Sequence, residues 1–161
     1  MTEPAAADPL DTSLLFDVFA LNQAVGRLLA EAMRDGALTP TEYAIYSAIF
    51  ELEAATPTVL ANRLGMRLTT FVDQLREIER RGHAGRIDHP TDGRSYRVVL
   101  TGDGLAAHRA ANRDYERAVA RFDRELGEGA AAARAALRAV REAALRAREE
   151  AAIPRSGGRA G

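Results

Sequence analysis

The sequence contains no cysteine, no tryptophan and no lysine in its 161 residues. The absence of cysteine excludes disulfides, thiolate metal sites and cysteine-based redox sensing. No apolar run reaches the length of about 18 residues that a membrane-spanning helix needs, so no membrane partner is expected. The N-terminus is acidic and lacks the basic start and apolar stretch of a secretory signal. Together these absences predict a soluble cytoplasmic protein.

Charge is nearly balanced over the whole chain, with a formal net charge of -1. This balance argues against a protein that coats nucleic acid through bulk electrostatics, because that binding needs an excess of cations. The segment 61–100 differs, since it holds eight arginines and five acidic residues, a local net charge of +3. Any DNA binding is therefore expected to depend on this segment.

Hydrophobic periodicity predicts a mainly helical chain with one β-hairpin. An amphipathic helix is expected from Asp11 until Asp35-Gly36 ends the pattern. The next two helices are expected after the capping pairs Thr39-Pro40 and Thr56-Pro57, and the second of them should end at Gly65. Further along, the pattern predicts a helix over 68–81, strands near 85–89 and 95–100, a helix after residues 101–104 and a last helix over 130–152.

The first helix and the last two are too long for a small central domain to cover. Because an amphipathic helix must bury its apolar stripe, a second copy of the chain is the expected partner. The predicted fold is mainly α with a small β-hairpin wing, a winged helix-turn-helix flanked by N- and C-terminal dimerisation helices. The expected parts are an N-terminal dimerisation helix at 10–36, a winged helix-turn-helix DNA-binding domain at 37–100, C-terminal dimerisation helices at 101–153 and disordered tails at 1–9 and 154–161.

Several short motifs follow one another between Leu38 and Gly104. They are Leu38-Thr-Pro-Thr-Glu-Tyr, the Leu60-Ala61 to Leu64-Gly65 turn, Arg81-Gly82 followed by Arg86, and Asp92-Gly-Arg-Ser95 leading into Val98-Val-Leu-Thr101. Each is weak alone, but their order and spacing together are specific. On these motifs the chain resembles the MarR-type transcription regulators. The resemblance implies a homodimeric repressor that binds double-stranded DNA at an inverted repeat and responds to a small aromatic or amphipathic effector.

In the wing, the resemblance implies that Arg94 enters the minor groove and that Asp92 holds it. The alternative is a solvated hairpin with an exposed ion pair of little energetic value. Gly93 stands where relatives carry a basic residue, so the wing has one cation fewer than expected.

The helix over 68–81 is expected to read base edges with its exposed face near the N-terminus. The candidate base-reading residues are Thr69, Thr70, Asp73 and Gln74. The carboxylate of Asp73 would repel phosphates unless it meets a donor or pairs with Arg67, Arg76 or Gln74. Alternatively, Asp73 only favours the positive end of its own helix.

Three arginines are expected to contact the DNA backbone. Arg67 stands at a helix N-cap, where a cation is unfavourable unless a phosphate lies nearby. Arg63 and Arg86 are further candidates for contacts that position the protein without reading sequence. The alternative is that these side chains are exposed and have no partner.

Catalysis is not expected, and neither is a cofactor or a metal. His83, His89 and His108 lack metal-ligand spacing, and the sequence has no glycine-rich phosphate loop and no nucleophile-base pattern.

The aromatic residues of the first half are expected to belong to the core. These are Phe16, Phe19, Tyr43, Tyr46 and Phe50. The resemblance also implies a small-molecule site between the dimerisation helices and the winged domain, which the same residues would line together with His108 or Arg109.

A second function stays open. The acidic net charge, Asp73 and Gly93 are also compatible with a winged-helix dimer that no longer reads DNA and serves as a protein-interaction module.

Overall fold

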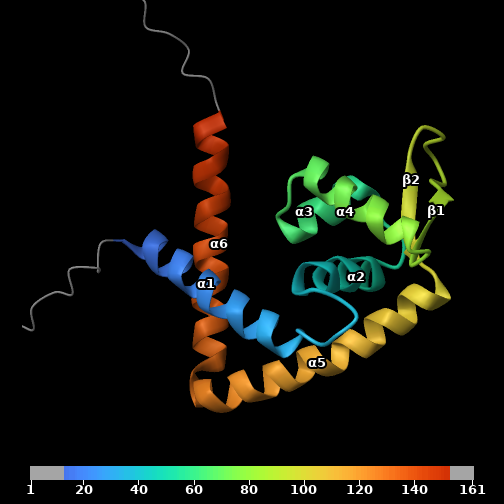
Figure 1. Cartoon of the computed structure of the whole chain (residues 1–161). Helices are drawn as coiled ribbons and strands as arrows, with labels where there is room; N and C mark the ends of the chain where they lie inside the picture. The colour runs from blue at the N-terminus through green and yellow to red at the C-terminus, as the bar shows by residue number, and fades with distance from the viewer. Residues whose placement is uncertain (1–12, 153–161) are drawn as a thin grey trace, which may run out of the picture. The chain divides into compact units, whose positions relative to one another are not determined.

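A computed structural model describes residues 13–152 of the chain (Figure 1). The expected tails at 1–9 and 154–161 and the expected helix start at Asp11 lie outside the described residues. The chain forms two compact units, residues 1–118 and 119–161. Its elements are α1 (Leu14–Ala32), α2 (Pro40–Leu52), α3 (Pro57–Leu64), α4 (Leu68–Arg80), β1 (Ala84–Asp88), β2 (Tyr96–Leu100), α5 (Gly102–Leu126), a 3-10 turn (Gly127–Gly129) and α6 (Ala130–Ala152). The predicted fold class, mainly α with one hairpin, is confirmed.

Local signals set the starts of α2 and α3. The Thr39 hydroxyl accepts a hydrogen bond from the backbone N–H of Glu42 at 3.3 Å, and the Glu42 carboxylate accepts one from the backbone N–H of Thr39 at 2.8 Å. This reciprocal pair is the capping box that the sequence predicts. The Thr56 hydroxyl caps α3 by accepting the backbone N–H of Val59, without a reciprocal side-chain bond, and Gly65 ends that helix in the left-handed region at a φ of 67°.

The core of the first unit is built around α2. Ile45, Tyr46 and Ile49 are at most 1% exposed. They pack with fully buried side chains of α3, α4 and the hairpin, which are Leu60, Phe71, Leu75, Ile78 and Val98. Burying about eight large apolar side chains is the main stabilising contribution in such a domain.

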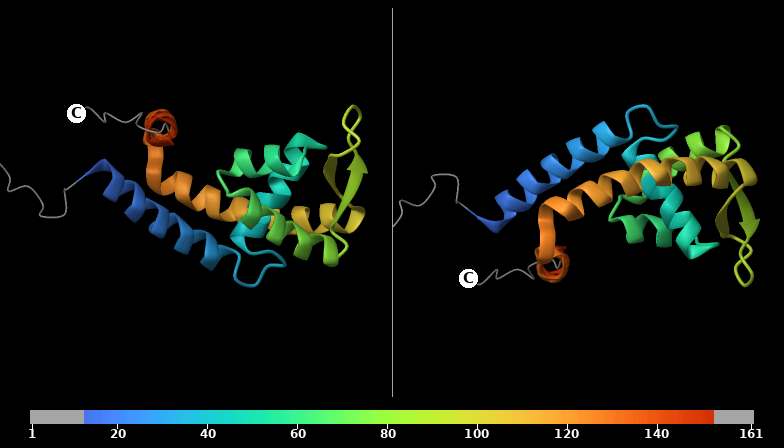
Figure 2. Two further views of the ribbon diagram at one scale, coloured as in Figure 1. Left: turned by 90° about the horizontal axis from the view of Figure 1, so that it is seen from above. Right: turned by 90° about the horizontal axis from the view of Figure 1, so that it is seen from below.

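The wing is an antiparallel hairpin in which Ala84 pairs with Leu100 and Asp88 with Tyr96. The backbone N–H of Val98 also donates to the carbonyl of Ala55 at 2.9 Å, which ties the hairpin to the segment between α2 and α3. The turn between the strands projects away from α5 (Figures 1 and 2).

The terminal helices differ from the core. No residue of α1 is fully buried, and Leu15 and Phe19 are 73% and 60% exposed. On α6, Leu137 and Leu145 are also exposed. The expectation that the aromatic set is core is confirmed for Tyr43 and Tyr46. For Phe16, Phe19 and Phe50 it is wrong in the single chain, because these rings lie on exposed helix faces.

Helix α5 begins against the end of α4 at a very close backbone approach. Thr101 donates its hydroxyl to the carbonyl of Gly82 at 2.7 Å and accepts the backbone N–H of Gly104 at 3.1 Å. A Cβ on Gly104 would lie 2.0 Å from the carbonyl oxygen of His83, so only glycine fits.

Substitution Gly104→Ala should therefore destabilise the protein by about 1–3 kcal/mol or more, because the clash is with backbone and cannot be relieved by a rotamer change. The control is Gly102→Ala at the start of the same helix, where a Cβ meets nothing within 4 Å. The midpoint of urea denaturation measures both. Equal midpoints for the two variants would contradict the close approach.

Candidate nucleic-acid interface and effector cavity

Helix α4 has one buried face and one polar face. Phe71, Leu75 and Ile78 are fully buried against the core. Leu68, which the sequence places on the same face, is 45% exposed because it lies in the first turn, at the edge of the core. The helix is thus held by its apolar face, and its opposite face is available to a partner.

The candidate base-reading residues do not all lie on that opposite face. Thr69, Thr70 and Asp73 are exposed, whereas Gln74 is half-buried at the flank of the apolar face. The carboxylate of Asp73 accepts a hydrogen bond from Nη1 of Arg76 at 2.7 Å. Asp73 is therefore paired with one of the three partners that the sequence allowed.

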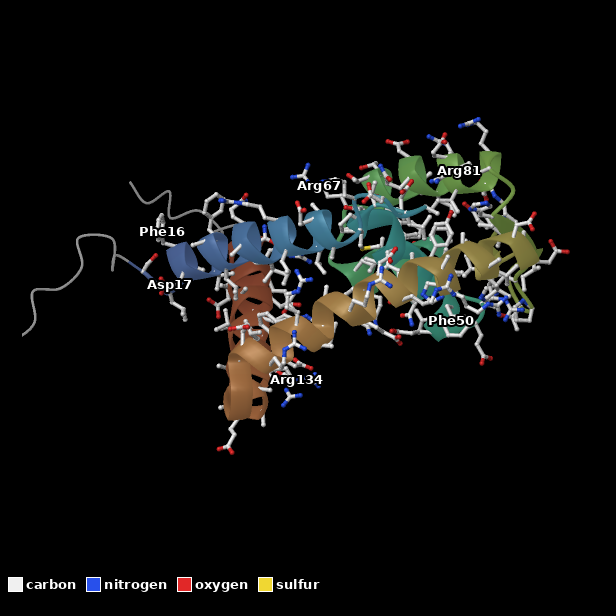
Figure 3. All side chains as sticks on the ribbon, turned by 60° about the horizontal axis from the view of Figure 1, so that its bottom comes forward. Phe16, Asp17, Phe50, Arg67, Arg81 and Arg134 are labelled. Atoms are coloured by element: carbon white, nitrogen blue, oxygen red, sulfur yellow. The ribbon has the colours of Figure 1, made fainter. Side chains whose placement is uncertain are left out.

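Arg67 occupies the N-cap of α4, and no side chain caps the helix there. The first backbone N–H groups of α4 and the exposed Arg67 side chain lie close together at this end of the helix (Figure 3). Because both carry positive charge, the arrangement is unfavourable in isolation and would be relieved by an anion.

Arg63 and Arg86 already have partners within the chain. Nη2 of Arg63 lies 3.0 Å from Oε2 of Glu51, and both side chains are about half exposed. Nε and Nη2 of Arg86 donate to the two carboxylate oxygens of Glu79 at 2.6 and 2.8 Å. The guanidinium of Arg86 also lies 4.3 Å from the centre of the Tyr96 ring. The bidentate pair with Glu79 therefore fastens the wing to α4, while the cation–π contact with Tyr96 lies within the hairpin itself.

In the wing turn, Asp92 orders the backbone. Its Oδ1 accepts the backbone N–H of Arg94 at 3.0 Å, and its carbonyl accepts the N–H of Ser95 at 3.0 Å. The Arg94 side chain is exposed. Asp92 therefore holds Arg94 through the main-chain N–H of that residue. The sequence predicted that Asp92 holds Arg94, but not which atoms make the contact.

A partly buried ion pair joins the ends of two helices. Arg81, just after the end of α4, pairs with Glu42 in the first turn of α2, and their side chains are only 26% and 17% exposed. Burial opposes ionisation of Glu42, but hydrogen bonds from Thr39 and Arg81 outweigh it and lower the pKa of that carboxyl. Since the partners are 39 residues apart, no local sequence pattern signals the pair.

A cavity of about 330 Å³ lies among α1, α2, α3 and α5 in the first unit. Its lining is apolar with a few polar groups, and comprises Leu29, Met33, Pro40, Tyr43, Ala44, Ser47, Ala48, Glu51, Arg63, Leu64 and Tyr115. Its volume is at the lower end of the range for small-molecule sites.

An aromatic cluster lies beside this cavity. The imidazole of His108 stacks on Tyr43 at 5.4 Å and contacts Phe50 at 5.1 Å between ring centres. Nε2 of His108 shares a hydrogen bond of 3.0 Å with the hydroxyl of Ser47. Burial lowers the pKa of His108, and the neighbouring charge of Arg109 lowers it further. The ring is therefore held in its neutral form.

Of the seven residues proposed for the effector site, the structure brings together Tyr43, Phe50 and His108 in the aromatic cluster and leaves the other four apart from it. Tyr43 lines the cavity, Phe50 borders a separate hollow near Leu105, and Tyr46 is fully buried with its hydroxyl 2.8 Å from Nδ1 of His83. Phe16 and Phe19 are exposed on α1, and Figure 3 shows Phe16 at the far end of that helix from the core.

His108 stacks on Tyr43 from the side of α5, and Arg109 is exposed. Most of the cavity lining was not predicted from the sequence, including Leu29, Met33, Ser47 and Tyr115. Tyr115 was recognisable as the first member of an apolar stripe on its helix, but its neighbours come from three other helices.

The chain is similar to known proteins in sequence and in fold. No protein-family model matches the chain. The HTH-type transcriptional regulator TtmR of Methylorubrum extorquens (strain PA1) is 28% identical over 106 residues, which cover 65% of this chain. The chain spans only 54% of that curated relative.

Solved structures give a consistent picture. The PcaV transcriptional regulator from Streptomyces coelicolor, in complex with its natural ligand, is 27% identical with a TM-score of 0.73, covering 86% of this chain and 99% of that chain. The repressor CouR bound to a 23-mer DNA duplex is 23% identical, with a TM-score of 0.73 and coverage of 86% and 98%. A MarR variant from E. coli complexed with operator DNA is 21% identical, with a TM-score of 0.73 and coverage of 83% and 99%. The resemblance to MarR-type winged helix-turn-helix proteins is confirmed.

Among residues 13–152, no helix is both long and apolar enough to cross a bilayer.

Substitution His108→Gln should remove a pH dependence of stability. Because the pKa of His108 is lowered in the folded state, the unfolded chain takes up a proton that the folded chain resists. Wild-type stability should therefore be full above the ordinary histidine pKa of about 6.5 and fall as the pH decreases below it, by at most about 1.4 kcal/mol per pH unit for one proton.

Urea denaturation between pH 7.5 and 5 measures this slope. The His89→Gln variant in the wing is the control and should keep the wild-type slope. If the His108→Gln variant loses stability on acidification as steeply as the wild type, burial of that ring does not account for the effect.

Proposed function

We propose that this chain, a winged helix-turn-helix protein of the MarR type, is a sequence-specific DNA-binding transcription regulator that acts as a homodimer. The observation that carries the proposal is the combination of an outward polar face on α4, an uncapped N-terminus beside Arg67, and a braced wing turn that presents Arg94. Helix N-termini and exposed arginines are the groups that bind a phosphate backbone, and an exposed helix face reads base edges in the major groove.

Within this proposal the residues divide into two groups. Thr69, Thr70 and Asp73 contact base edges, with Gln74 at the flank of the reading face. The second group positions the protein or enters the minor groove, and comprises Arg63, Arg67, Arg86, Asp92 and Arg94. Arg63 and Arg86 would donate hydrogen bonds to phosphate oxygens without leaving Glu51 and Glu79, because a paired guanidinium still has unused N–H donors.

The homodimer is supported by the apolar surface of the terminal helices. Helix α1 has no fully buried residue although Leu14, Leu15, Phe16, Phe19 and Leu21 are all large and apolar. Exposed apolar surface of this kind on a folded chain marks an interaction site. Two-fold symmetry would present two copies of α4 to successive major grooves and requires an approximately inverted-repeat operator.

The effector-responsive step is assigned to the cavity among α1, α2, α3 and α5. Its size suits a single aromatic ring, and its polar lining atoms suit an amphipathic molecule. The cavity touches α3, which leads directly through Gly65 and Arg67 into α4. A ligand that favours one dimer geometry would shift the population of DNA-competent molecules, so that effector binding relieves repression.

Substitution Arg94→Ala should weaken binding of the purified protein to the DNA upstream of its own gene by about tenfold, because one exposed cation in the wing is lost. The slope of log K against log salt should fall by about 1. Fluorescence anisotropy over a series of salt concentrations measures both quantities.

The control is Arg34→Ala, which removes an exposed arginine from the turn after α1, where it pairs with Glu31. It should leave affinity and slope unchanged. A different outcome is that the wild type binds neither its upstream DNA nor any sequence selected from a random pool more tightly than bulk DNA. That result favours the alternative that the protein is a protein-interaction module.

The wild-type protein should have the mass of two chains at micromolar concentration in analytical ultracentrifugation. The Phe19→Glu variant should shift toward the mass of one chain, because a carboxylate replaces an apolar ring that is 60% exposed in the single chain. A monomeric wild type would overturn the homodimer, and a fully dimeric variant would remove Phe19 from the interface.

A further inference from the structure

The outer face of α4 carries a stripe of four residues that face away from the core. Thr69, Asp73, Arg76 and Arg80 are spaced four, three and four residues apart, so they lie one above another along the helix. All four are exposed, and the buried residues Phe71, Leu75 and Ile78 lie on the opposite side. Any partner that meets this face of the helix meets this stripe.

The two arginines of the stripe are held differently. Arg80 donates through Nε and Nη2 to both carboxylate oxygens of Glu77, at 2.8 and 2.6 Å, so its Nε–Nη2 edge is fully used and only the terminal Nη1–Nη2 edge stays free. Arg76 donates through Nη1 alone to one oxygen of Asp73, at 2.7 Å. This bond occupies one of the five N–H donors of the guanidinium and leaves a two-donor edge for another acceptor.

We propose that Arg76, oriented by Asp73, reads a guanine in the major groove and is a determinant of operator sequence. This inference rests on the proposed function, since it assigns a role within DNA reading. Guanine presents two acceptors, O6 and N7, on its major-groove edge, and an arginine fork matches them.

The ion pair with Asp73 favours a base over a phosphate as the target of Arg76. A guanidinium already neutralised by a carboxylate gains little from the diffuse negative charge of the DNA backbone. Its free donor edge stays available despite that neutralisation, and the hydrogen bonds it can make remain directional. Pairing also restricts the rotamers of a long side chain, which lowers the entropic cost of holding it against a base edge.

The same geometry gives Asp73 a role that does not require it to approach a phosphate. The carboxylate holds the arginine, and its second oxygen remains able to accept from the amino group of a nearby cytosine. Both side chains are about two-thirds exposed, so the pair contributes little to folding and can be altered without loss of the fold.

Selection from a random-sequence DNA pool tests the proposal with the full-length wild type and the variants Arg76→Ala, Arg76→Lys, Asp73→Asn and Arg80→Ala. The selected sites are then measured individually by fluorescence anisotropy. The wild type should select a G·C pair at one symmetric position of each half-site. Replacing that pair should weaken wild-type binding by about ten- to a hundredfold.

The Arg76→Ala and Arg76→Lys variants should lose preference at that position and keep it elsewhere, because lysine retains the charge without the fork. Asp73→Asn should broaden the same position. Arg80→Ala, the matched control on the same stripe, should keep the wild-type preference at every position.

The proposal is overturned if the Arg76→Ala variant selects the wild-type sites with the same preferences, including when its affinity falls uniformly, since a uniform loss means a backbone contact. It is also overturned if Arg80→Ala loses the same base preference. A wild type that selects no sequence would instead refute the proposed function itself, together with this inference.

Discussion

Burial of α2 is the constraint on which the rest of the structure depends. Its face of Ile45, Tyr46 and Ile49 is almost completely removed from solvent. Because α3, α4 and the hairpin all pack against that one face of α2, the position of each depends on the others. A close-packed interior does not deform continuously, so these positions are fixed together. The outward polar face of α4 and the wing are therefore held in one fixed relation within the first unit.

Two ion pairs further fix the relative positions of elements that apolar burial already holds together. Arg81 fixes the end of α4 to the start of α2 through Glu42, and Arg86 fixes the wing to α4 through Glu79. The first contact joins α4 to the core helix α2, and the second joins two elements that both carry candidate DNA contacts. In a chain whose only strong cation is arginine, the planar guanidinium fork serves here as a structural fastener as well as a candidate ligand for DNA.

Two kinds of exposed surface are available for binding partners, one apolar and one polar. No residue of α1 is fully buried although several are large and apolar, while the outward stripe of α4 is polar and both of its arginines are paired with carboxylates of the same helix. A surface with nearly balanced charge cannot attract DNA strongly at long range. Recognition by such a surface depends on hydrogen-bond geometry more than on charge, which agrees with the acidic net charge of the chain.

The sequence by itself determined the elements and their caps, since helix starts at Thr39 and Thr56 and the stop at Gly65 depend on neighbours within four residues. It also determined which face of α4 is apolar, because helical periodicity is a local property. Only the tertiary structure decided which arginines are paired, where the cavity lies, and that Gln74 sits at the flank of the reading face while Arg76 stands on it. These features depend on the register between helices far apart in the chain and on side-chain rotamers, which no short-range pattern encodes.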